Sequence, residues 1–74
     1  MSNQAQIDEW KRNYLVGFRA VADEDCGVDA DADGDRCCYE FWHALTPEQR
    51  TARIANPLDG ETDGRNDADA LNEA

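Results

Sequence analysis

The sequence predicts a small all-α protein: a helix-loop-helix unit, a short third helix and a disordered acidic C-terminal tail. Apolar residues recur at helical spacing on both sides of an Asp-rich stretch. The segment Thr46–Gln49 reads Thr-Pro-Glu-Gln, which is a strong helix-start signal. The last part of the chain is dominated by Asp, Gly and Asn. We therefore divide the 74 residues into a helical domain, 1–57, and an acidic tail, 58–74.

The first helix follows from a single apolar stripe. Its large residues recur three or four positions apart: Ile7, Trp10, Tyr14, Phe18 and Val21. This spacing predicts a helix from residue 3 to about residue 25. Gly17 is either a local weakness in that helix or a point where another helix comes close. Gly27 suits the left-handed residue that commonly closes a helix.

Two further helices follow the Asp-rich stretch. Cys38, Phe41 and Leu45 lie at helical spacing and form one face of a second helix. The third helix begins at the Thr46–Gln49 signal, with threonine as its cap and proline at its first position. It ends where Pro57 interrupts it.

The expected core and the expected disorder both follow from where large apolar residues lie. All six aromatic residues fall between Trp10 and Trp42, so the first helix should pack against the second. After Leu58, the only large apolar residue is Leu71. Such a segment buries too little apolar surface to offset the entropy of ordering it. We therefore expect residues 58–74 to be disordered.

One edge of the second helix is a candidate partner-binding surface. Phe41 and Trp42 are adjacent in the sequence, so we do not expect both of them to face the same partner helix. Tyr39 and Trp42 are three residues apart and form a second apolar edge. A domain of two or three helices has too few elements to cover both edges. We expect Tyr39 and Trp42 to bind a protein partner, or a second copy in a homodimer.

Length and charge exclude several classes of function. The chain has 17 acidic and seven basic residues, which gives a net charge of −10. This balance argues against direct binding of nucleic acid or of an anionic membrane. The chain is too short for the large enzyme folds. It shows no signal-like or membrane-spanning segment, so we expect a cytoplasmic, non-enzymatic binding protein.

The Asp-rich stretch contains a metal-binding pattern. Residues 29–40 read DADADGDRCCYE, with Asp at positions one, three and five, Gly at six and Glu at twelve. Calcium takes oxygen ligands, and glycine permits the sharp turn that brings them together. The pattern resembles the calcium-binding loop of the EF-hand family. That resemblance implies a Ca²⁺ site between the first two helices, held by Asp29, Asp31, Asp33, Asp35 and Glu40.

The flanking sequence departs from the family in part. Arg36 stands at position eight, which is usually aliphatic, and Cys37 at position nine offers sulfur to an ion that prefers oxygen. EF-hands usually occur in pairs, and residues 59–70 copy only the first half of the pattern before ending in Ala70.

The alternative interpretation needs no metal. A compact and strongly negative domain can occlude a basic surface of a target protein, and the opposite charges accelerate association. Small acidic helical proteins encoded by phages resemble this chain in composition, and some of them mimic nucleic acid. In this interpretation the acidic loop binds the target, with Tyr39 and Trp42 as its anchor.

The cysteines support no other site. Cys26, Cys37 and Cys38 are odd in number, which argues against a disulfide framework. With His43 they are four nominal zinc ligands, but they lack the spacing of a zinc site, so we expect small buried hydrophobes. A Cys38 nucleophile served by His43 would have neither an oxyanion hole nor a pocket in so short a chain.

Overall fold

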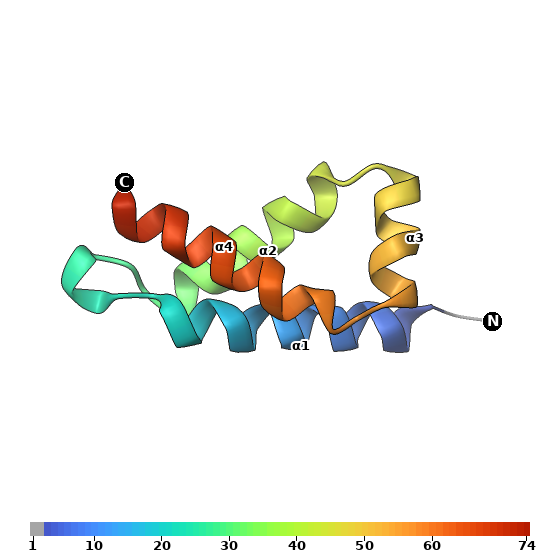
Figure 1. Ribbon diagram of the computed structural model, residues 1–74, viewed down its shortest axis with the longest axis horizontal. Coiled ribbons are helices and arrows are strands. Elements are labelled where there is room, and N and C mark those ends of the chain that lie inside the picture. Colours follow the sequence, from blue (N-terminus) through green and yellow to red (C-terminus); the bar gives the residue numbers. More distant parts are fainter. Residues whose placement is uncertain (1–2) are drawn as a thin grey trace.

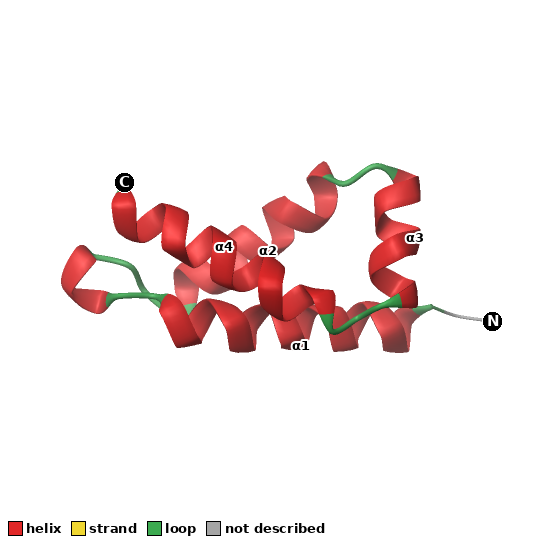
Figure 2. Cartoon of the chain, viewed as in Figure 1, coloured by secondary structure: helices red, strands yellow, loops and turns green. Residues whose placement is uncertain are grey.

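The longest helix, α1, is the base on which the other elements lie (Figure 1). The computed structural model describes residues 3–74, and in that range it contains helices and loops but no strand (Figure 2). The all-α prediction is therefore confirmed. The elements in chain order are α1 (Gln4–Val21), the 3₁₀ turn η1 (Glu24–Cys26), α2 (Ala32–Ala44), α3 (Pro47–Ala55) and α4 (Asp59–Glu73).

The helix α1 ends at Val21, earlier than the end near residue 25 that the sequence predicts. Acidic side chains are unfavourable at the negative end of a helix dipole, and the acidic residues after Ala22 form the separate turn η1. The Asp23 carboxylate caps this turn by accepting a hydrogen bond from the backbone N–H of Asp25, at 2.9 Å. Gly27 has the predicted left-handed conformation, with φ of 83°, but it closes this turn and not the first helix.

The helix α2 begins earlier than expected, inside the Asp-rich stretch. One Asp29 carboxylate oxygen accepts hydrogen bonds from the N–H groups of Asp31 and Ala32, at 2.9 and 3.0 Å. Asp33 and Asp35 lie in the first turn, where the helix dipole favours negative charge. The aspartates that suggested a loop thus stabilise the start of a helix.

The helix α3 begins as predicted. The Thr46 hydroxyl accepts a hydrogen bond from the N–H of Gln49, at 3.2 Å, and the Gln49 side chain accepts one from the N–H of Thr46, at 2.8 Å. This reciprocal pair is a capping box. The helix ends at Ala55, two residues before Pro57, which confirms the third helix of the prediction.

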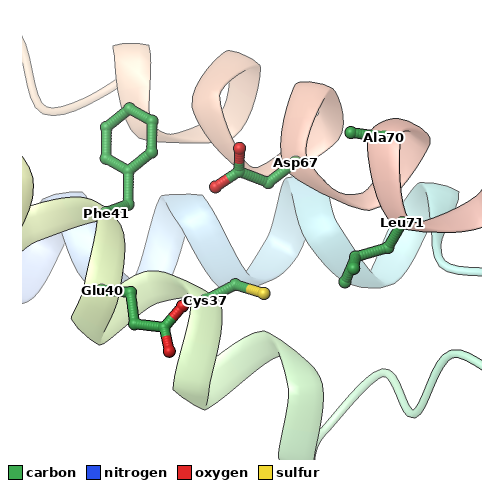
Figure 3. Close-up of a pocket in the computed structure, with 6 residues that line it drawn as sticks. All are labelled: Cys37, Glu40, Phe41, Asp67, Ala70 and Leu71. Atoms are coloured by element: carbon green, nitrogen blue, oxygen red, sulfur yellow. The ribbon is translucent and has the colours of Figure 1, made fainter. Parts of the chain in front are cut away.

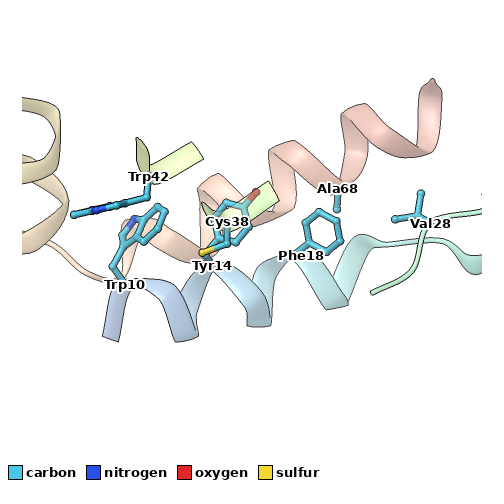
Figure 4. Packing of buried hydrophobic residues seen from close by; sticks show 7 residues of the cluster. All are labelled: Trp10, Tyr14, Phe18, Val28, Cys38, Trp42 and Ala68. Atoms are coloured by element: carbon cyan, nitrogen blue, oxygen red, sulfur yellow. The ribbon is translucent and has the colours of Figure 1, made fainter. Parts of the chain in front are cut away.

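The core side chains lie in a row along α1, with Trp10 towards one end and Val28 at the other (Figure 4). Trp10 is the centre of its aromatic part. Its ring lies 5.2 Å from that of Trp42 and 5.8 Å from that of Phe41, measured between centroids. The expectation that Phe41 and Trp42 would not share a partner helix is therefore wrong, because the large indole reaches both rings. The buried core residues are Trp10, Tyr14, Phe18, Val28, Cys38, Trp42 and Ala68.

The segment predicted to be a disordered tail is the ordered helix α4, and this is the main correction to the sequence analysis. Its inner face carries Gly60, Gly64 and Ala68 at intervals of four residues, and all three are buried. A Cβ at Gly64 would overlap the Tyr14 carbonyl oxygen and lie 2.8 Å from the Phe18 nitrogen. The backbones of α1 and α4 therefore touch. The close approach at Gly17, one of its two interpretations, is confirmed by the position of α4.

Hydrogen bonds add to this close approach. The Trp10 indole N–H donates to the Asp63 carboxylate at 3.3 Å, and the Tyr14 hydroxyl donates to that of Asp67. Near the C-terminus, the Asn72 amide donates to the Val21 carbonyl at 2.8 Å. The small residues bring the helices together, and the polar residues beside them find partners on α1. The predicted tail therefore packs on α1 instead of forming a separate region.

Candidate functional site

Negative charge is concentrated at one end of the elongated molecule. This acidic end, residues 23–35, holds seven carboxylates and no lysine or arginine. It comprises η1, the loop after it and the first turn of α2, and it lies far from α3 (Figure 1). Six of the seven acidic residues are exposed: Asp23, Glu24, Asp25, Asp29, Asp31 and Asp35.

The carboxylates of the predicted calcium loop have separate partners. The Asp29 carboxylate accepts hydrogen bonds from the N–H groups of Asp31 and Ala32 at the start of α2, and its own N–H donates to the Asp33 carboxylate at 2.9 Å. Asp31 forms an ion pair with Arg19 of α1, at 3.2 Å. The structure thus brings Asp29 and Asp33 together and directs Asp31 towards α1.

Arg36 forms ion pairs with two carboxylates of the pattern, those of Asp33 and Glu40. Its guanidinium lies 3.3 Å from an Asp33 oxygen and 3.9 Å from a Glu40 oxygen. Asp35 lies beside Tyr39 and Cys38, at a second and smaller cavity between α1 and α2. Four side chains therefore do not converge on one point.

The geometry of this pattern differs from a closed calcium loop. Positions four to twelve, residues 32–40, are helical. Residues 3–74 contain no group of three or more His, Cys, Asp or Glu side chains placed to hold a metal ion. Ca²⁺ ligation by Asp29, Asp31, Asp33, Asp35 and Glu40 stays a prediction, and it would require α2 to unwind at its start. Within the same residues, the three cysteines and His43 are likewise not grouped so that they could hold a zinc ion.

The hydrogen bonds at the start of α2 stabilise the ionised form of Asp33. The N–H of Asp29 is the main cause that lowers the pKa of Asp33, and Arg36 lowers it further. Asp33 is therefore held in its charged form as part of the helix start.

The predicted partner edge is divided between the surface and the core. Tyr39 is 65% exposed, whereas Trp42 is 8% exposed and packs against Trp10. Arg50 of α3 places its guanidinium 5.6 Å from the Trp42 ring centroid. Because Trp42 is covered, the predicted anchor keeps only Tyr39 at the surface. The homodimer stays a prediction.

A groove between α2 and α4 was not predicted from the sequence. This α2–α4 groove has a volume of about 360 Å³ and is lined by Cys37, Glu40, Phe41, Asp67, Ala70 and Leu71 (Figure 3). It exists because α4 packs on α1 beside α2, which the interpretation of a disordered tail excluded. The available signal was the four-residue spacing of Gly60, Gly64 and Ala68, which indicates a face for close helix packing.

Asp67 is the polar group at the inner side of this groove. Burial is the main cause that raises its pKa, and the negative charge of Asp63 also raises it, whereas the hydrogen bond from Tyr14 lowers it. The same burial and the same hydrogen bond raise the pKa of Tyr14, so its hydroxyl stays a donor. Asp67 is thus a half-buried carboxylate that has a hydrogen-bond donor but no ion pair among the described residues.

The cysteine thiols are free and poorly activated. Cys26 is exposed, Cys37 lines the α2–α4 groove, and Cys38 is buried. Burial is the main cause that raises the pKa of Cys37, and it raises that of Cys38 to about 11. His43 stacks on Tyr39, with 4.2 Å between ring centroids. A thiol with a raised pKa is a weak nucleophile at neutral pH.

Comparisons of the chain with protein-family models, with curated proteins and with solved structures find no match. Within residues 3–74, no helix combines the length and the apolar character that crossing a membrane requires.

Proposed function

We propose that this protein is a non-enzymatic binding protein whose acidic end covers a basic surface of a partner protein, as an inhibitor or adaptor does. One observation carries the proposal. Among residues 3–74, the seven carboxylates of residues 23–35 form ion pairs with only two arginines, Arg19 and Arg36, which bind Asp31 and Asp33. Most of the negative charge at this end is uncompensated.

The shape of the molecule supports the same function. Its dimensions are 43 × 19 × 17 Å, and the acidic end lies at one extremity of the long axis (Figure 1). Neighbouring like charges add to a potential that attracts a positively charged surface and accelerates the encounter. A narrow negative end can approach such a surface without obstruction by α3.

This function needs no metal, whereas the EF-hand-like pattern implies one. Calcium would have to replace the hydrogen bonds of Asp29 and Asp33 at the start of α2. A chelator therefore distinguishes the two interpretations. We also propose a cytoplasmic location, because three free cysteines suit a reducing compartment.

An oligoarginine peptide tests the proposal as a surrogate for a basic surface. The first variant is the triple substitution Glu24→Gln, Asp25→Asn and Asp35→Asn, because these side chains are exposed and form no hydrogen bond or ion pair within the described residues. Fluorescence anisotropy of the labelled peptide should show binding about tenfold weaker than with the unmodified protein. Binding of the unmodified protein should weaken as salt is added.

A second triple variant controls for total charge. Glu9→Gln, Glu48→Gln and Asp59→Asn remove three charges from the other part of the molecule, again without breaking a side-chain hydrogen bond or ion pair within the described residues. We expect binding close to that of the unmodified protein, in buffer with or without a chelator. Equal weakening by the two triple variants would overturn the proposal, because binding would then follow net charge alone. Loss of binding on chelation would instead favour the calcium site.

A further inference from the structure

One helical turn from the α2–α4 groove, α4 already binds an arginine side chain of the protein itself. One turn before Asp67, the Asp63 carboxylate accepts a hydrogen bond from Trp10, at 3.3 Å. It also forms a two-point ion pair with Arg53 of α3, with N–O distances of 3.1 and 3.2 Å. The Arg53 guanidinium lies over the Phe41 ring, 5.7 Å from its centroid. An arginine is thus held between one carboxylate and one aromatic ring.

Asp67 repeats this arrangement without the arginine. It follows Asp63 by one helical turn and accepts a hydrogen bond from Tyr14, as Asp63 does from Trp10. Among the described residues, no lysine or arginine forms an ion pair with it. Figure 3 shows its carboxylate pointing from α4 towards the side of the groove where Phe41 lies.

The lining of the groove suits a long side chain that ends in a cation. Phe41, Leu71, Ala70 and Cys37 provide apolar walls for an aliphatic stem, and Asp67 provides the charge. Glu40 adds a second carboxylate at the rim, and its distance of 3.9 Å from Arg36 leaves it weakly paired. A volume of about 360 Å³ lies within the range of small ligand pockets.

We propose that the α2–α4 groove binds an arginine side chain of a partner protein, with its guanidinium paired with Asp67 and its aliphatic stem along the apolar lining of the groove. Arginine fits better than lysine because its planar guanidinium can pair with a carboxylate at two points, as Arg53 does with Asp63. This inference rests on the proposed function, since the arginine belongs to a basic partner surface. It adds a specific pocket to an otherwise diffuse attraction between charges.

Backbone amide shifts in ¹H–¹⁵N NMR spectra test the pocket and the acidic end separately. On addition of an oligoarginine peptide, the amides of Cys37, Ala70 and Leu71 should shift, together with those of residues 23–35. In the Asp67→Asn variant, the shifts of these three groove amides (the groove shifts) should disappear. The affinity for the peptide should fall about tenfold, because a charge-assisted hydrogen-bonded pair is lost. The amide oxygen of the new side chain can still accept the Tyr14 hydrogen bond, so the fold is expected to persist.

Two further variants keep the test decisive. Asp69→Asn removes a charge from an exposed position of the same helix and should leave the groove shifts unchanged. Ala70→Leu fills the groove without changing charge and should abolish the groove shifts even if Asp67→Asn disturbs α4. An oligolysine peptide of equal length should move the acidic end but produce smaller shifts in the groove.

The outcomes separate the two proposals. Groove shifts that persist in Asp67→Asn and Ala70→Leu overturn the arginine pocket, even where the acidic end still binds. Equal groove shifts with oligolysine overturn the choice of arginine. Groove shifts without any response from residues 23–35 would overturn the proposed function of the acidic end and support the pocket alone.

Discussion

Two helices pack on the same face of α1 by opposite means. The helix α2 contributes large side chains, and its Trp42 and Phe41 rings lie against Trp10. The helix α4 contributes Gly60 and Gly64, which bring its backbone against that of α1. A helix with almost no large apolar residue can therefore still join a core, provided that its small residues share one face.

The largest effect should come from the aromatic contact. Trp42→Ala removes a buried ring, and such substitutions cost about 3–5 kcal/mol. A domain of this size rarely has more stability than that, so we expect the variant to be largely unfolded. Tyr39→Ala, on the exposed side of the same helix, is the matched control and should change stability by about 0.5 kcal/mol or less. Urea unfolding followed by circular dichroism measures both, and similar losses would contradict the division between Tyr39 and Trp42.

The backbone contact should be the next most sensitive. Gly64→Ala would stabilise an isolated helix by about 1 kcal/mol. Here the added Cβ meets the backbone of α1, so we expect a net loss of about 2 kcal/mol or more, with α4 released.

Asn66→Ala provides the contrast, because residue 66 lies on the exposed face of α4. It should leave stability unchanged or raise it slightly. Amide hydrogen exchange along α4 would show the release directly. A stabilising Gly64→Ala variant would mean that the two backbones do not touch.

The smallest effect concerns the half-buried carboxylate between these helices. Burial raises the pKa of Asp67, so the folded protein holds this proton at a higher pH than the unfolded chain. Asp67 therefore adds stability below its unfolded pKa, and this contribution is lost as the pH rises through its folded pKa. We expect the free energy of unfolding of the unmodified protein, minus that of Asp67→Asn, to increase as the pH is lowered through this range.

Urea unfolding at several pH values measures this difference. Asp69→Asn is the control for the loss of one charge from the same helix. A difference that decreases on acidification would show that Asp67 is stabilised in its charged form by a partner.

Only those parts of the candidate site that depend on residues close together in the sequence could be predicted. The acidic end follows directly from the run of carboxylates between Arg19 and Arg36, and the calcium pattern within it is a matter of spacing. Whether those aspartates surround an ion or stabilise the start of a helix depends on competing hydrogen bonds, such as those that Asp29 accepts from the N–H groups of Asp31 and Ala32. The groove could not be predicted, because it needs the position of α4.

The helical class, the aromatic stripe of α1 and the capping box that begins α3 can all be read from local sequence, because each depends on neighbours within about one turn. The helix of residues 59–73 instead depends on its packing against α1. Their own composition does not stabilise it, and what does is the close fit of Gly60 and Gly64 against α1 together with the hydrogen bonds of Asp63 and Asp67. Such contacts join residues about fifty positions apart, and no local pattern specifies which backbone a glycine will meet.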